Sequence, residues 1–239
     1  MRCILGLVLE LLSPIFYQSI PSLMITNPRS ILRELLYRLP HPVFTDTLKA
    51  GTKSKRGNVY GQAYCTQFGW SRCHPMVHKS EAHETLSMLF KRDGVPPKIV
   101  ADNSKEQSFG NFAKKCREAD CHLVNTEPHS PWMMAAEGCI KELKRGSSRK
   151  MLKSGSPKRL CDHAIELEAL IRSHTALDIY ALQGQVPETI MTGQTADISN
   201  LCEYEWFQWV MYYEPPLSYP DDKMCTGNIW DLLLMLVLP

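Results

Sequence analysis

The sequence predicts an α/β domain with a mixed five-stranded sheet covered by helices on its faces, between poorly ordered N- and C-terminal extensions. Two observations predict this class. Short strand-like runs open the domain, and later strands alternate with segments whose apolar residues recur at helical spacing. The 239 residues are 44% hydrophobic and 22% charged, which is typical of a globular chain with one sizeable core.

Three strands are expected first, in a domain that begins at His41. Residues 43–48 form the first strand, and a basic turn leads to residues 58–67 and 70–77, which the Phe68-Gly69 turn joins. Strands connected by such short turns pair antiparallel. The start of the domain therefore reads as a meander of three strands.

Helices and strands alternate from residue 81 onward. Ala82, Leu86, Leu89 and Phe90 recur at the spacing of one helix face. The elements expected after the meander are a helix at 81–92, a strand at 98–101, a helix at 106–119, a strand at 121–124, and helices at 134–152 and 160–177. The expected segments of the chain are an irregular extension at 1–40, the core at 41–182, a trailing segment at 183–213 and an irregular tail at 214–239.

Cysteine usage and the terminal segments bear on the compartment. The nine cysteines are an odd number with no CxxC pair, which favours neither a disulfide framework nor a zinc ribbon and fits a reducing compartment. Glu10 interrupts the apolar N-terminal run, and residues 232–238 are too few to span a bilayer. We therefore expect an intracellular protein, cytoplasmic and nuclear, that is not secreted and has no membrane partner.

Two acids stand at informative places. Asp102 ends the apolar run at 98–101, and Glu137 lies near the start of the predicted helix at 134–152, with 34 residues between the two acids. A third acid, Asp46, lies on the first predicted strand. Taken singly, Asp102 is more typical of a loop start and Glu137 of a solvated helix face. Acids placed together this way are typical of ligands for Mg²⁺ or Mn²⁺, which prefer oxygen donors.

The helix that carries Glu137 continues into a strongly basic stretch. Between Lys141 and Arg159 lie eight basic residues and a single acid. Lys141 and Lys144 follow Glu137 by four and seven residues, so the three share one helix face. With Arg145 and Arg149 they are candidates for binding nucleic-acid phosphates, in a salt-dependent way that is largely independent of sequence. The alternative is a basic helix face that is merely solvated.

Five short segments occur in an order that resembles a known family. They resemble the catalytic core of retroviral-type integrases, in the copia-type retrotransposon branch, and the resemblance covers about residues 42–213. The segments are Phe44-Thr-Asp46-Thr, Ser54-Lys-Arg-Gly-Asn58, Asp102-Asn-Ser-Lys-Glu106, Glu127-Pro-His-Ser-Pro-Trp132 and Ala136-Glu137.

The resemblance implies a ribonuclease-H-like fold and DNA integration as the activity. It implies that Asp46, Asp102 and Glu137 are both the catalytic residues and the ligands of two Mg²⁺ or Mn²⁺ ions, which together promote an in-line phosphoryl displacement. It further implies DNA as the partner, both element ends and target duplex, and a homo-oligomer as the active form. The chain would then be a fragment of a retrotransposon polyprotein.

The sequence also departs from this family. Met133-Met134 stands where active relatives carry Gln-Asn ahead of the catalytic Glu, and residues 1–40 lack the paired His and Cys of the usual N-terminal zinc domain. Two other functions therefore stay open. One is a catalytically dead nucleic-acid-binding remnant. The other is a ribonuclease-H-like nuclease, for which Glu106 is the nearest candidate for a fourth acid.

Overall fold

The computed structural model describes residues 38–102, 110–126, 135–213 and 224–228. The described residues divide into two compact units, and the division falls between Asp197 and Ile198. The first unit contains the sheet and most of the helices. Most of the two predicted extensions lies outside the described residues, and the predicted domain boundaries stay predictions.

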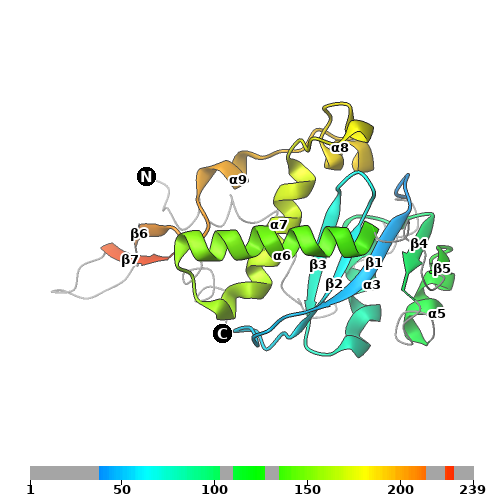
Figure 1. Ribbon diagram of the computed structural model, residues 1–239, viewed down its shortest axis with the longest axis horizontal. Coiled ribbons are helices and arrows are strands. Elements are labelled where there is room, and N and C mark those ends of the chain that lie inside the picture. The colour runs from blue at the N-terminus through cyan, green and yellow to red at the C-terminus, as the bar shows by residue number, and fades with distance from the viewer. Residues whose placement is uncertain (1–37, 103–109, 127–134, 214–223, 229–239) are drawn as a thin grey trace. The chain divides into compact units, whose positions relative to one another are not determined.

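A five-stranded mixed sheet forms the centre of the first unit (Figure 1). Its order is β3-β2-β1-β4-β5, with β1 in the middle. β2 pairs antiparallel with both β1 and β3, whereas β4 pairs parallel with both β1 and β5. The strands are β1 (Val43–Lys49), β2 (Tyr60–Cys65), β3 (Ser71–Met76), β4 (Lys98–Ala101) and β5 (His122–Asn125). The predicted mixed five-stranded sheet is confirmed.

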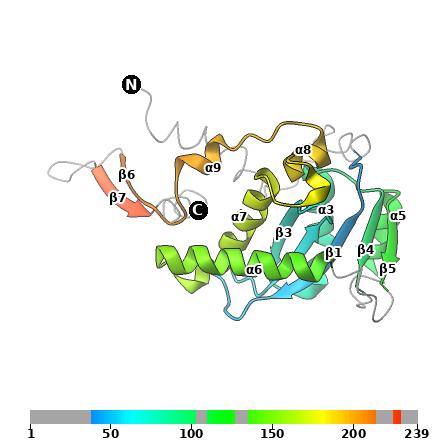
Figure 2. The ribbon, with the colours of Figure 1, turned by 45° about the horizontal axis from the view of Figure 1, so that its top comes forward.

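Helices cover both faces of this sheet (Figure 2). On one face, α3 (Ala82–Arg92) and α5 (Asn111–Glu118) pack on Val43, Tyr64 and Ile99. On the other, α6 (Ala135–Ser154) and α7 (Cys161–His174) pack on Leu48, Ala63 and Cys73. Because alternate residues of a strand point to opposite faces, β1 supplies apolar side chains to both layers. Burial of this kind is the main stabilising contribution to such a fold.

The predicted helices are found with shifted ends. The stripe Ala82, Leu86, Leu89 and Phe90 is buried as expected. A short 3₁₀ turn, η1 (Lys79–Glu81), precedes α3, and another, η3 (Lys158–Leu160), precedes α7. The last predicted helix stops at His174 rather than 177, because Thr175 adopts an extended backbone. The predicted first residues of α5 and α6, at 106–109 and 134, lie outside the described residues.

Short elements follow α7. After η4 (Tyr180–Leu182), α8 (Pro187–Thr192) has proline at its start and ends at Gly193, whose φ of 73° suits glycine. The second unit holds α9 (Ser199–Glu203) and an antiparallel pair, β6 (Trp209–Tyr213) with β7 (Met224–Asn228). The predicted irregular tail therefore contains a strand. Among the helices in the described ranges, none is long and apolar enough to cross a membrane.

Candidate active site

The first two acids lie side by side on neighbouring strands. In the parallel pair of β1 and β4, Thr45 is opposite Ala101, and Asp46 and Asp102 are the next residues along each strand. Phe44 and Val100, two residues earlier, belong to one buried cluster together with Ala136 of α6. Because side chains alternate along a strand, both acids are on the face that α6 covers.

Glu137 comes to this place from the start of α6. Its neighbour Ala136 is buried in the cluster with Phe44 and Val100, and the Cys65 thiol of β2 donates to the Ala135 carbonyl at 3.6 Å. These contacts hold the first turn of α6 against the sheet. Glu137 itself is exposed. The helix start thus carries its carboxylate to the edge where the two aspartates lie.

The charges of Asp102 and Glu137 act on the carboxyl group of Asp46. Burial raises the pKa of Asp46, the Thr47 backbone N–H that donates to Oδ1 at 2.6 Å lowers it, and the charges of Asp102 and Glu137 raise it further. Lys79 opposes them weakly. The net result is a pKa above the ordinary value. The Asp46 carboxylate is therefore a half-buried negative charge that two other negative charges repel.

The oxygen ligands of the three acids suit a hard cation, but the three side chains are not gathered closely enough to enclose one. Three carboxylates offer only oxygen ligands, and a divalent cation would relieve their mutual repulsion. Within the described ranges, however, no three His, Cys, Asp or Glu side chains are gathered so that they could hold a metal ion. Thr126 Oγ1 contacts Asp102 Oδ1 at 3.4 Å. The acids fit Mg²⁺ or Mn²⁺ in kind, and they do not form a closed metal centre.

The predicted phosphate-binding residues all lie on the exposed side of α6. Lys141, Lys144, Arg145 and Arg149 are exposed, whereas Ile140, Leu143 and Ser147 face the core. The Arg145 guanidinium forms an ion pair with the Glu142 carboxylate at 3.4 Å. The structure therefore leaves a basic helix face that begins one turn past Glu137.

Lys150, unlike the four exposed basic residues of α6, forms an ion pair with α7. Its ammonium pairs with the Glu168 carboxylate of α7 at 2.6 Å, and this pair is largely buried. Lys150 therefore joins α6 to α7 instead of facing solvent. Sequence reasoning could not separate it from the exposed basic residues of the same helix, because its partner lies 18 residues further along the chain.

The segment Ser54–Asn58, one of the five that resemble the integrase family, makes contacts that stabilise the fold. In Ser54–Asn58, the Asn58 N–H donates to the buried Ser54 Oγ at 2.9 Å. Arg56 donates to Asp162 at 2.8 Å and to Glu166 at 2.6 Å, both on α7. These contacts tie the β1–β2 loop to α7. They do not involve the three acids.

Several residues named from the sequence cannot be placed. Glu106 and Met133-Met134 lie outside the described residues.

His74 is buried, packs against the Tyr64 ring with centroids 5.9 Å apart, and burial lowers its pKa to about 4. These features make His74 a packing residue. The structure groups no metal-binding set around it in the described ranges.

The sequence matches no family model and no curated protein. Among solved structures, it is similar to a chain of the simian T-cell lymphotropic virus intasome, solved in complex with PP2A regulatory subunit B56 gamma. That match has 14% identity and a TM-score of 0.51, covering 79% of this chain and 67% of the other. It is also similar to the catalytic core domain of BIV integrase, with 12% identity, a TM-score of 0.47 and coverage of 63% and 93%. The sheet order, the helices on both faces and the intasome match together show that the chain has an integrase-like, ribonuclease-H-like fold.

Proposed function

We propose that this chain is the integrase catalytic domain of a copia-type retrotransposon, which joins element DNA ends to target DNA by strand transfer. The main support is that Asp46 and Asp102 lie side by side on β1 and β4 and that the charge of Glu137, from the start of α6, acts on Asp46. Both other acids raise the pKa of Asp46, as expected for carboxylates that share one site. The integrase-like fold and the ordered sequence segments support the same proposal.

The three acids would hold two Mg²⁺ or Mn²⁺ ions. Bound there, such ions activate an attacking oxygen and stabilise the leaving oxygen of a phosphodiester. The chain itself would orient the site, because β1 and β4 set Asp46 and Asp102 side by side and the buried Ala136 holds the first turn of α6, which carries Glu137, against the sheet. Lys141 and Lys144 bind DNA phosphates next to this site, and Arg145 and Arg149 extend the contact along α6.

A strand-transfer assay tests the activity. A labelled element-end duplex is incubated with plasmid and Mg²⁺ or Mn²⁺, and joined products are counted. We expect Asp102→Asn and Glu137→Gln each to abolish joining while circular dichroism stays native. Asp178→Asn removes an exposed acid outside the site and is the matched control. Full joining by either site variant would refute the assignment.

Metal binding is tested without turnover. A ligand that binds only the folded chain raises its stability with concentration. We expect Mg²⁺ and Mn²⁺ to raise the melting temperature of the native chain and of Asp178→Asn. Asp46→Asn should lose most of that rise. Equal rises in all three proteins would show that the ions bind elsewhere.

The same assays separate the two other functions. Cleavage of an RNA–DNA hybrid without joining would favour a ribonuclease-H-like nuclease. DNA binding with neither joining nor cleavage would favour a catalytically dead remnant.

The active form and the location are part of the proposal. We propose a homo-oligomer on DNA, which sedimentation with element-end duplexes tests. We also propose an intracellular location, cytoplasmic and nuclear. The described cysteine side chains are free thiols, which is compatible with a reducing compartment. Fractionation of cells that express the tagged chain tests the location, and recovery from the medium would contradict it.

A further inference from the structure

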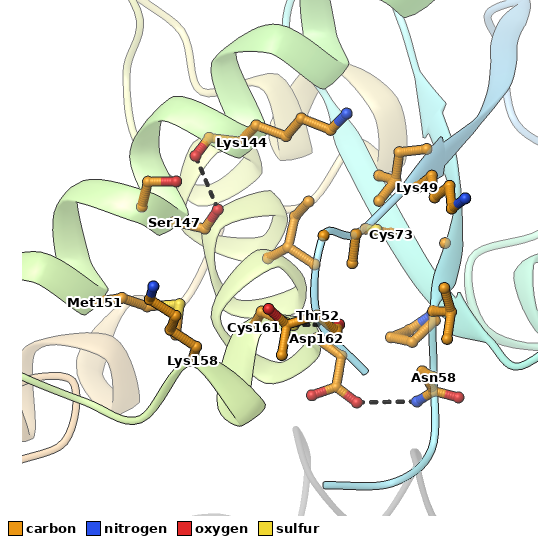
Figure 3. A pocket seen from close by; sticks show the side chains of 18 of the residues that line it. Lys49, Thr52, Asn58, Cys73, Lys144, Ser147, Met151, Lys158, Cys161 and Asp162 are labelled. Carbon is orange, nitrogen blue, oxygen red and sulfur yellow. Dashed lines mark hydrogen bonds between the residues drawn. The ribbon is translucent and has the colours of Figure 1, made fainter. Parts of the chain in front are cut away.

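A pocket opens beside α6, and none of the three acids lines it. Its volume is about 640 Å³, within the range of pockets that hold small molecules. The walls come from the β1–β2 hairpin end, from the second half of α6 and from the start of α7 (Figure 3). Lys144 is the one residue of its lining that the proposed strand transfer also uses.

The floor of the pocket is apolar. Leu48, Cys73 and Ile165 belong to the buried cluster between the sheet and the two helices, and all three line the pocket. Met151 and Leu152 of α6 add an apolar wall, and Leu152 is 85% exposed. An exposed leucine over an open apolar floor is costly in water, and an apolar ligand body would cover both.

Three polar side chains of the walls, those of Asn58, Ser147 and Asp162, already have partners inside the protein. Asn58 donates to Asp162 at 2.9 Å, and the Ser147 hydroxyl donates to the Lys144 carbonyl at 3.1 Å (Figure 3). Asp162 also accepts from Arg56 at 2.8 Å. Partial burial is the largest single influence on the pKa of Asp162 and raises it, but the charges of Arg56 and His163 and the hydrogen bonds from Asn58 and Arg56 together hold that pKa below the usual value. The single acid of the pocket is therefore neutralised.

Three lysines remain to define the charge of the pocket. Lys49, Lys144 and Lys158 line it from β1, α6 and η3. In the part of the chain that the structure describes, none of these ammonium groups has a carboxylate within ion-pair distance, in contrast to Lys150. Figure 3 shows Lys144 extending from α6 toward the strand side of the pocket. Three lysines around an apolar floor favour an anion with an apolar body.

We propose that this pocket binds a small amphipathic anion, an apolar ring or chain that carries one carboxylate, sulfonate or phosphate group. The apolar body lies on Leu48, Cys73 and Ile165, and the anionic group faces Lys49, Lys144 and Lys158. The mouth is open at two glycines, since a Cβ built at Gly51 or Gly155 meets nothing within 4 Å. This inference goes beyond DNA strand transfer and does not depend on it.

Two fluorescent probes with the same aromatic body test the charge requirement. The first is 8-anilinonaphthalene-1-sulfonate, and the second is N-phenyl-1-naphthylamine, which lacks the sulfonate. We expect the anionic probe to bind the folded chain at least about tenfold more tightly, as charge-assisted contacts imply. Near-UV circular dichroism establishes that the chain is folded. Equal affinity for both probes would overturn the proposal.

Variants then locate the site. Lys49→Gln with Lys158→Gln should weaken the anionic probe about tenfold and leave the neutral one unchanged. Lys53→Gln, an exposed lysine of the same loop outside the pocket, is the matched control. Ser148→Trp should block both probes, whereas Ser80→Trp on η1 should not. Unchanged probe binding in Ser148→Trp would overturn the proposal. In a competition experiment, octanoate or naphthalene sulfonate should displace the anionic probe. Displacement by duplex DNA but by neither of these two anions would also overturn the proposal.

Discussion

Gly146 of α6 lies directly over the Glu168 carboxylate of α7, so closely that a Cβ at residue 146 would overlap the carboxylate atoms. The same carboxylate pairs with Lys150 one turn further along α6. Gly146 therefore leaves the space that the Glu168 carboxylate occupies, and this position of the carboxylate permits the largely buried ion pair. α6 is the helix that also carries Glu137.

We expect Gly146→Ala to destabilise the fold. The added methyl group forces the Glu168 carboxylate to move and strains its pair with Lys150, which should cost about 1–3 kcal/mol of the free energy of unfolding, less up to about 1 kcal/mol from the better helix propensity of alanine. Urea denaturation measures this change. Gly138→Ala on the same helix is the control, because a Cβ there meets nothing within 4 Å. It should raise stability by up to about 1 kcal/mol. Equal effects of the two substitutions would contradict the steric explanation.

We expect Asp46→Asn to stabilise the chain at pH 7 without divalent ions. The pKa of Asp46 is higher in the folded chain than its ordinary value. Protonated Asp46 therefore favours the folded state at pH values below the ordinary pKa. That contribution disappears as pH rises through the raised pKa.

The gain for Asp46→Asn should be below about 1 kcal/mol, because Asp46 is only half-buried and solvent screens its charge. Urea denaturation as a function of pH measures it. The difference between variant and native chain should vanish near pH 3, where both side chains are neutral. Asp178→Asn should show no comparable trend. A constant difference at all pH values would rule out charge repulsion as its cause.

We expect Arg72→Ala to be among the most damaging single substitutions. The Arg72 guanidinium is buried, pairs with Asp93 at 2.8 Å and with Glu188 of α8 at 2.9 Å, and lies 4.7 Å from the centre of the Trp70 ring. Its removal leaves two acids with little solvent access and no cation, so the free energy of unfolding should fall by about 3–5 kcal/mol. Chemical denaturation measures the loss. Arg117→Ala on the exposed side of α5 should change stability far less.

We expect Lys141→Gln and Lys144→Gln to weaken DNA binding through loss of charge. Each phosphate contact contributes about 0.9 to the slope of log affinity against log salt concentration, so each substitution should reduce that slope by about this amount. Fluorescence anisotropy of a labelled duplex over a series of salt concentrations gives the slope. Lys91→Gln on α3, which packs on the opposite face of the sheet, should leave it unchanged. A uniform loss of affinity with an unchanged slope would exclude direct phosphate contacts.

Local pattern was enough to find most elements of the first unit. Apolar residues at helical spacing, such as Ala82, Leu86, Leu89 and Phe90 of α3, are readable without the fold. The strand Met224–Asn228 was not found, because it pairs with Trp209–Tyr213, which lies outside that local window. The end of α7 was less accurate, because helix ends depend on individual turns and caps: the helix predicted to run to 177 stops at His174.

The sequence alone determined the chemistry available to this protein: Asp46, Asp102 and Glu137 as oxygen donors, and a basic helix that follows the last of them. Only the tertiary structure decided which groups meet. Asp46 and Asp102 have 55 residues between them in sequence and become neighbours through the parallel register of β1 and β4. Lys150 leaves the basic surface because α7 supplies Glu168, and the lysine-rimmed pocket exists because the β1–β2 hairpin and two helices surround it. Such proximity comes from long-range packing, whereas donor type and charge belong to each residue wherever the chain places it.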